Sequence, residues 1–205
     1  MLQALRRPWF AGGTVRYASV HADLHRLHDG AEGFEDGTPD FLAIAALPAG
    51  FALLEEVGMP RLQRRVASLT ADLLARLRRL RHPDGAPRVR LYGPEALDAR
   101  GGAVCFNLLD QKGRPLPFAR VESAAREAGI SIRGGCFCNP GAAEAAFGVD
   151  PARLEQCLRD AGEDFSPRYL SDCTGAEVGA IRASLGLANN SDDIDRLEAL
   201  LASLA

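Results

Sequence analysis

The pattern of hydrophobic and polar positions predicts two long helices in the first part of the chain. Residues 41–54 carry no charge and predict a buried helix, with Thr38 as its N-cap and Pro39 in its first turn. From Arg61 to Arg81, apolar residues recur every three or four positions and predict a second helix with one stripe facing the core. Its many arginines predict a solvated face, which we favour over a membrane-surface helix.

Beyond residue 86 the pattern changes to short apolar runs separated by turn residues. Four of these runs predict strands, at residues 89–92, 103–109, 130–133 and 180–185. Three helices are expected between and after them, at residues 118–128, at 151–161 after an Asp150 cap, and at 192–204 after a Ser191 cap. The pattern therefore predicts an α+β domain whose helices pack on one face of a sheet.

Composition narrows the class of protein. The chain has 205 residues, of which 47% are hydrophobic and 25% charged, as in soluble globular proteins. A net charge of -3 gives no electrostatic reason to expect nucleic acid as a partner. The uncharged run is too short, and too interrupted by Pro48 and Gly50, to predict a membrane span. No apolar segment follows Arg6 and Arg7, so no secretory signal is expected.

The cysteines point to a reducing compartment and to one reactive loop. Five cysteines, an odd number, do not form a disulfide framework, and we expect a cytoplasmic protein. Cys136 and Cys138 lie in a glycine-flanked loop directly after Arg133. Since a neighbouring guanidinium lowers the pKa of a thiol, Arg133 is suited to activate one of them as a nucleophile. The alternative is a buried pair of small side chains, against which the Asn139-Pro140-Gly141 turn argues.

Three other groups of residues suggest a ligand. The Gly12-Gly13-Thr14 loop offers backbone N–H groups and a hydroxyl, which commonly hold a phosphate. Three histidines, His21, His25 and His28, have the spacing of one helical face that zinc could use, although a site would need a fourth ligand. A thiolate zinc site is a further alternative, but its spacing is not that of paired zinc ligands. Its members would be Cys136, Cys138, Cys157 and Cys173.

Several of these segments together resemble the C-terminal half of class V aminotransferase-fold enzymes, in order and in spacing. The cysteine loop is most similar to the cysteine desulfurase-type domain of molybdenum cofactor sulfurases. The resemblance covers nearly the whole chain. The segments that carry it are Gly12-Gly13-Thr14, residues 34–39, Tyr92-Gly93-Pro94, Cys136-Phe137-Cys138 and residues 182–186.

The resemblance implies a fold and a division of the chain. The fold would be the C-terminal small domain of pyridoxal phosphate (PLP) fold type I, with an antiparallel-rich sheet and helices on one face. A remnant of the large PLP-binding domain and long connecting helices would precede this small domain. The expected ranges are 1–39 for the remnant, 40–85 for the connecting helices and 86–205 for the small domain.

The resemblance also implies an activity. Enzymes of this kind use pyridoxal 5'-phosphate to remove sulfur from L-cysteine, leaving alanine and a protein-bound persulfide that passes to a sulfur acceptor. Cys138 falls at the family's persulfide position, with Cys136 as a second thiol. Arg182 falls at the position that binds the substrate carboxylate, although a salt bridge at a strand edge is an alternative. Gly12, Gly13 and Thr14 would reach the cofactor phosphate in the neighbouring subunit of a homodimer.

Departures from the family pattern limit what this chain is expected to do alone. The family's Schiff-base lysine precedes the Gly-Gly-Thr loop, whereas the one lysine of this chain is Lys112, in a predicted exposed turn. The third cysteine of the sulfurases falls at Ala143, and no molybdenum cofactor domain follows the last predicted helix. We therefore expect the chain to be inactive by itself. Other class V lyase reactions, or a truncated, non-catalytic dimerisation or interaction module, are the alternatives.

Overall fold

The computed structural model describes residues 13–19, 21–22, 24–35, 39–94, 96–98, 100–135, 137, 140–161 and 166–204. The chain divides into two compact units, Met1–Gly58 and Met59–Ala205, and each is described by itself. The three-part division implied by the resemblance stays a prediction.

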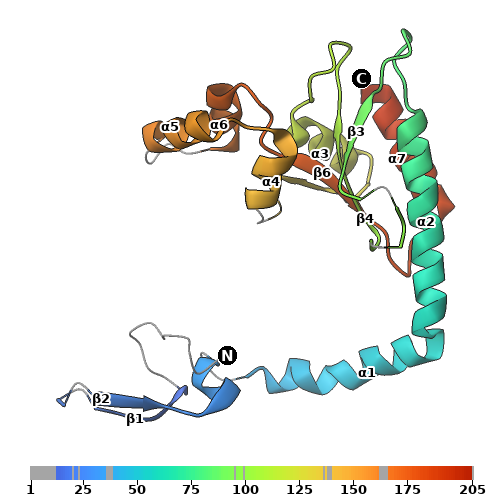
Figure 1. Ribbon diagram of the computed structural model, residues 1–205. Coiled ribbons are helices and arrows are strands. Elements are labelled where there is room, and N and C mark those ends of the chain that lie inside the picture. Colours follow the sequence, from blue (N-terminus) through green and yellow to red (C-terminus); the bar gives the residue numbers. More distant parts are fainter. Residues whose placement is uncertain are drawn as a thin grey trace. The chain divides into compact units, whose positions relative to one another are not determined.

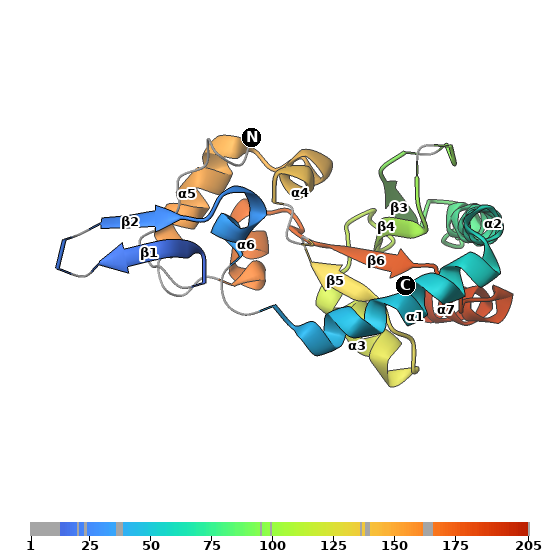
Figure 2. The same ribbon diagram turned by 90° about the horizontal axis from the view of Figure 1, so that it is seen from below.

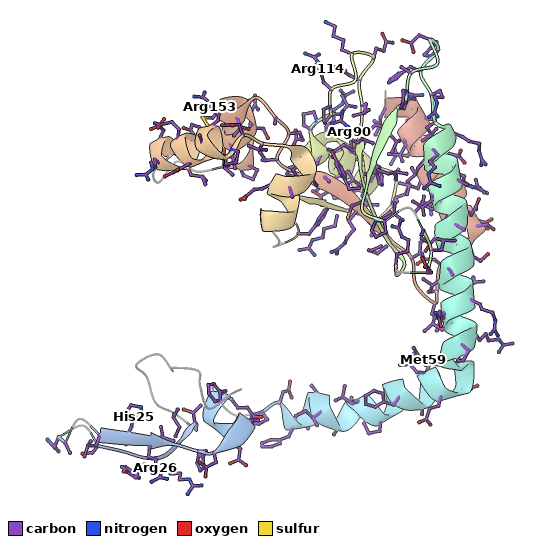
Figure 3. The ribbon with its side chains drawn as sticks, viewed as in Figure 1. His25, Arg26, Met59, Arg90, Arg114 and Arg153 are labelled. Atoms are coloured by element: carbon purple, nitrogen blue, oxygen red, sulfur yellow. A yellow bond between two sulfur atoms is a disulfide. The ribbon has the colours of Figure 1, made fainter. Side chains whose placement is uncertain are left out.

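The first unit contains an antiparallel hairpin where the sequence suggested a helical histidine face. Strands β1 (Val15–Ser19) and β2 (Leu24–Leu27) pair, and a 3-10 helix, η2 (Gly30–Phe34), follows them. His25 lies in β2 opposite Ala18, and Figure 3 labels it there. The predicted helical face was wrong because strand pairing overrides the helical spacing of the three histidines. Among the described residues, no group of three or more side chains could hold a metal ion.

Helix α1 (Phe41–Val57) confirms the predicted helix but not its cap or its burial. The N-cap is Asp40, whose carboxylate accepts the Ala43 N–H at 3.0 Å, and Thr38 lies outside the described residues. No residue of α1 is buried, and Leu42 is 87% exposed. The prediction of a buried helix was wrong because apolar residues surround this helix without one packed stripe, and no described element of the first unit covers them.

No single described helix is both long and apolar enough to cross a membrane, and only α1 and the helix that follows it, α2 (Met59–Arg79), counted together across their break, reach that length and composition.

The second unit is built on a four-stranded antiparallel sheet in the order β3-β4-β6-β5. Three strands match the predicted runs closely: β3 (Val89–Tyr92), β4 (Ala103–Leu108) and β6 (Ala180–Ser184). The fourth, β5, covers Arg133–Gly135 and not residues 130–133. It begins later because Ile130 closes the turn that ends the preceding helix, and its N–H donates to the Ala125 carbonyl at 2.8 Å.

Three helices cover one face of this sheet, as the sequence predicts for an α+β domain. These are α2 (Met59–Arg79), α3 (Phe118–Glu127) and α7 (Ser191–Leu204), and α2 and α7 run side by side in Figures 1 and 2. Their buried apolar residues pack against alternate residues of β4 and β6, with Phe106 fully buried between them. Arg76 of α2 joins α7 through Glu198 at 2.8 Å and also contacts Asp195.

Of two predicted helix caps, one is confirmed and the other is wrong by one residue. Helix α5 (Pro151–Ala161) begins after Asp150, whose carboxylate accepts the Arg153 N–H at 2.7 Å, as predicted. Helix α7 is capped one residue earlier than expected, by the Asn190 side chain, which accepts the Asp193 N–H at 3.2 Å. An asparagine caps a helix as well as a serine does, so sequence alone did not separate the two.

A disulfide joins α5 to α6 (Pro167–Thr174), contrary to the expectation of unpaired thiols. Cys157 and Cys173 are bonded to each other, with their Cα atoms 5.9 Å apart, and Figure 3 shows the bond beside Arg153. Helix packing brings these two cysteines together although 16 positions separate them, and spacing in the sequence could not show this. The thiolate zinc alternative is therefore wrong, because two of its four ligands are paired in this bond.

Candidate functional site

The sheet face opposite the core helices carries a row of polar side chains. Directly paired residues of antiparallel strands point to the same face. Tyr92 pairs with Cys105, Cys105 with Arg182, and Arg182 with Arg133, so these four lie in one row across all four strands. Their chain neighbours Phe106 and Ile181 point the other way, into the core. The site is therefore built on the open face of the sheet.

Arg182 lies on β6, an inner strand of the sheet, and is only partly buried. Its Nε atom is buried and has no hydrogen-bond partner, and no described carboxylate lies within ion-pair distance of its guanidinium. The alternative of a salt bridge at a strand edge therefore finds no support among the described residues. A buried donor without a partner is costly, and such a group commonly marks a place where a ligand binds.

The cysteine loop reaches this arginine through Phe137. The Arg182 guanidinium carbon lies over the Phe137 ring, 5.1 Å from its centroid. Phe137 has a φ of 57°, a left-handed conformation that is uncommon for a residue other than glycine. Cys136 and Cys138 flank it and lie outside the described residues, so their predicted roles stay predictions. The structure does place Phe137, the residue between them, against Arg182.

Glycines beside the loop allow helix α3 to approach the sheet closely. A Cβ atom at Gly134 would lie 2.5 Å from the Phe118 ring, and one at Gly179 would lie 2.4 Å from the same ring. Both distances are too short for any larger residue without movement of Phe118. The Gly134 N–H also donates to the Glu122 carboxylate at 3.2 Å. These contacts hold the start of the cysteine loop and the start of β6, the strand of Arg182, against the same side chain of α3.

Sequence reasoning missed two residues of this face, Cys105 and Asn107. Cys105 is a free, partly buried thiol beside Arg182. Burial raises its pKa, while the charges of Arg182 and Arg100 act in the opposite direction. Asn107 is 1% exposed; its side chain donates to the Gly179 carbonyl at 3.0 Å, and its Oδ1 atom has no partner. Both sit within an apolar strand, and only the pairing register reveals that they share a face with Arg182.

The reactivity of Cys105 should follow its electrostatic surroundings. Thiolate is the form that reacts with alkylating reagents, so a raised pKa predicts slower alkylation near pH 7 than for free cysteine, with the rate increasing as pH rises. Arg182→Gln removes a charge that lowers this pKa, so the pH profile should move further upward, whereas Arg182→Lys should move it less. Peptide-resolved mass spectrometry of iodoacetamide-treated protein measures this. Faster alkylation in Arg182→Gln would contradict the electrostatic account.

A cavity of about 670 Å³ opens next to the row at the β3 edge. Tyr92 and Phe147 form part of its wall and contact each other edge to face, with ring centroids 5.3 Å apart. Glu177 lines it as well, and burial raises the pKa of its carboxyl group. Its other charged lining residues are Arg90 and Arg114, labelled in Figure 3, and Asp110 and Asp172. The cavity extends the polar face beyond Arg182 toward α6.

The Gly-Gly-Thr loop belongs to the first unit. Thr14 is 1% exposed, its carbonyl accepts the His28 N–H at 2.9 Å, and its hydroxyl has no hydrogen-bond partner. Gly13 directly precedes it, and Gly12 lies outside the described residues. An unpaired hydroxyl after a glycine fits a phosphate ligand, so the residues present suit the phosphate group of a cofactor.

The one lysine of the chain is found where the sequence places it, in an exposed turn. Lys112 lies between β4 and α3, and its backbone N–H donates to the Asp110 carboxylate at 2.8 Å. It is not among the residues of the polar row. Within the second unit, the described residues therefore offer a contact for a carboxylate at Arg182 but no lysine in the same row.

Comparisons with known proteins find a matching family model and several similar proteins. The family model for Aminotransferase class-V matches residues 1–197. The molybdenum cofactor sulfurase of Drosophila melanogaster is 35% identical over 97% of this chain and 27% of its own length, and that of Drosophila persimilis is 34% identical over 96% and 26%. The chain thus spans about a quarter of these relatives.

Solved structures support the same fold. The apo structure of a cysteine desulfurase from Thermococcus onnurineus has a TM-score of 0.60 at 23% identity and covers 96% of this chain and 38% of its own. The cysteine desulfurase CsdA from Escherichia coli has a TM-score of 0.52 at 19% identity, covering 95% and 37%. The predicted α+β architecture of PLP fold type I is therefore confirmed.

Proposed function

Since the chain belongs to the aminotransferase class V family, we propose that it is part of a PLP-dependent cysteine desulfurase that places the sulfur of L-cysteine on Cys138. The observation that carries this proposal is the contact between Phe137 of the cysteine loop and Arg182 on the open sheet face. It brings the loop with the two candidate thiols to an arginine whose Nε atom has no partner. Arg182 can thus hold the substrate while a cysteine of the loop receives its sulfur.

Arg182 is the proposed carboxylate-binding residue. A guanidinium donates two parallel hydrogen bonds to one carboxylate, which fixes the orientation of the amino acid as well as its position. Phe137 covers one face of this group and limits where it can point. The substrate would then lie over the open face, with its side chain free to meet the loop.

Cys138 is the proposed nucleophile. Its thiolate attacks the sulfur of cysteine, a sulfur–sulfur bond forms, and the bond between that sulfur and the substrate Cβ breaks. Cβ takes up a proton, so L-cysteine and a thiol become L-alanine and a persulfide. Cys136 is a second thiol of the same loop. The charge of Arg133 favours the thiolate form of a cysteine in this loop. PLP, when bound, supplies the electron sink for this reaction.

The fit of the chain to PLP is partial. The Thr14 hydroxyl and the Gly13 backbone suit the phosphate, which in a homodimer would belong to the neighbouring subunit. Lys112 does not lie with the polar row, so we propose that the Schiff-base lysine comes from another part of the complete enzyme. The chain by itself is then inactive. We also propose a reducing compartment, because the reaction requires a free thiol at Cys138; in that compartment Cys157 and Cys173 would be thiols and not the disulfide of this structure.

A chimaera tests this function. In the Drosophila melanogaster sulfurase, this chain would replace the segment that it matches at 35% identity. We expect the chimaera to release alanine in a cysteine-dependent reaction. Cys138→Ser should abolish this release, whereas the matched control Cys136→Ser should retain most of it. A chimaera that shows the absorption of bound PLP but releases no alanine would contradict the proposal.

An interaction module without catalysis is the second candidate, and one observation favours it. Helix α1 exposes large apolar residues along its length, including Phe41, Ile44, Leu47 and Phe51. Large exposed apolar surfaces commonly bind another protein. Under this alternative the PLP-binding chimaera would assemble but form no persulfide, so the same experiment separates the two candidates.

A further inference from the structure

We propose that Arg133 and Arg182 together form a two-arginine site for amino acids that carry a second negative group on the side chain. The inference rests on the proposed function for the place of the substrate, and it names the class of substrate. Arg182 would hold the α-carboxylate and Arg133 the second anionic group. L-cysteine belongs to this class when its thiol is ionised, and its sulfur then takes up a proton before the Cys138 thiolate attacks it.

The pairing of the strands is the first argument. Arg133 on β5 is directly opposite Arg182 on β6, on the same face of the sheet. Directly opposed residues of antiparallel strands have Cβ atoms only about 4.5–5.5 Å apart, and like charges at this spacing destabilise the sheet. Two guanidinium groups in this position favour a bound anion, which would remove their repulsion.

The lack of internal counter-charges is the second argument. Among the described residues, neither Arg133 nor Arg182 has a carboxylate within ion-pair distance, whereas Arg76 contacts three carboxylates and Arg114 pairs with Asp110 at 2.8 Å. Elsewhere in this unit, then, arginines do pair with acidic side chains of the chain itself. The two opposed arginines on the open face are left for a ligand from outside.

The neighbours of Arg182 do not supply the missing charge. Cys105, opposite Arg182 on the other side, has a pKa raised by burial and is therefore neutral near pH 7. Tyr92, at the end of the row, likewise has a raised pKa, mainly through burial, and is also neutral. Phe137 covers one face of the Arg182 guanidinium and is apolar. The row thus carries two positive charges and no negative one.

The number of charges sets the ligand class. A monoanionic ligand neutralises one guanidinium and leaves the other beside it unpaired, whereas a dianionic amino acid pairs with both. L-aspartate and L-asparagine have nearly the same shape and differ in this one charge. They are therefore a matched pair of probes that needs no turnover and no cofactor.

The test is titration of the isotopically labelled 205-residue chain with each amino acid at low ionic strength, followed by NMR. We expect L-aspartate to bind about tenfold more tightly than L-asparagine, the ratio that one added charge-assisted hydrogen bond typically gives. Added salt should reduce the difference, because the interaction lies at a partly exposed face. The shifted resonances should include those of β5 and β6.

Three variants test which arginine causes the preference for aspartate. Arg133→Gln should remove the preference for aspartate and leave asparagine binding unchanged, and Arg182→Gln should weaken both. Arg64→Gln, on an exposed position of α2, removes the same charge elsewhere and should change neither. Equal affinity for the two amino acids, a preference that survives Arg133→Gln, or no binding of aspartate would each overturn the inference.

The outcomes of this titration and of the chimaera experiment are independent. Alanine release by the chimaera without a preference for aspartate in the chain would leave the proposed function in place and overturn the two-arginine site. The opposite result is a preference for aspartate that depends on Arg133, together with a PLP-binding chimaera that releases no alanine. It would support the two-arginine site and overturn the proposed function.

Discussion

Arg182→Gln is expected to lower kcat/KM for L-cysteine in the chimaeric enzyme by roughly 100-fold, the effect of losing about 3 kcal/mol of charge-assisted hydrogen bonding. The reason is geometric. The Arg182 Nε atom is buried without a partner, and Phe137 restricts the orientation of the guanidinium, so the group is arranged before a carboxylate arrives. Steady-state rates of alanine release measure the effect.

Two controls show whether this loss comes from carboxylate binding. Arg182→Lys keeps the charge but cannot donate the two parallel hydrogen bonds, so it should recover only part of the rate. Arg64→Gln removes an exposed charge on α2 and should have no effect. Alanine, which keeps the carboxylate but lacks the sulfur, should inhibit the parent chimaera and fail to inhibit Arg182→Gln. Unchanged inhibition would mean that Arg182 does not bind the carboxylate.

Phe106→Ala is expected to destabilise the second unit by about 3–5 kcal/mol. Phe106 lies on β4 with no exposed surface, in the core between the sheet and helices α2, α3 and α7. Its removal leaves a cavity that the surrounding helices cannot fill without moving. Denaturant unfolding followed by circular dichroism gives the free energy, and hydrogen exchange of β4 and β6 assigns the loss to this unit.

The matched control for this change is Phe51→Ala in α1. Phe51 is 60% exposed, so the same substitution removes little buried surface and should alter the unfolding free energy by less than about 0.5 kcal/mol. Similar losses for the two variants would contradict the assignment of the core to the second unit and of α1 to an uncovered surface.

The sequence predicts the second unit well because burial there leaves a clear pattern. Strands β3, β4 and β6 alternate between core residues and polar ones, and α2 carries a single apolar stripe, so period and burial agree. The fold class followed directly from these elements. Short helices such as α4 (Pro140–Phe147) and α6 were not predicted, since neither has an amphipathic run long enough to identify it.

Other features depend on contacts that a pattern cannot contain. The three histidines have helical spacing, yet His25 pairs with a neighbouring strand. The apolar run of α1 predicts burial, but no described residue of the first unit covers it. Cys157 and Cys173 meet only because α5 and α6 pack together. In each case the local sequence is compatible with more than one structure, and tertiary packing determines which one forms.

The candidate site was predicted in part for the same reason. Family resemblance identified Arg182 and the cysteine loop, and the contact of Phe137 with Arg182 brings these two together. Cys105 and Asn107 were missed because a thiol or an amide inside an apolar strand looks like core until the register is known. The opposition of Arg133 and Arg182 is likewise a property of register.

The most direct test of the central claim is to locate the sulfur. The chimaera would be incubated with L-cysteine, persulfides would be trapped by alkylation, and the peptide that contains Cys136 and Cys138 would be sequenced by mass spectrometry. The account predicts a persulfide on Cys138 that requires both L-cysteine and Arg182. A persulfide confined to another cysteine, or one that forms equally in Arg182→Gln, would contradict it.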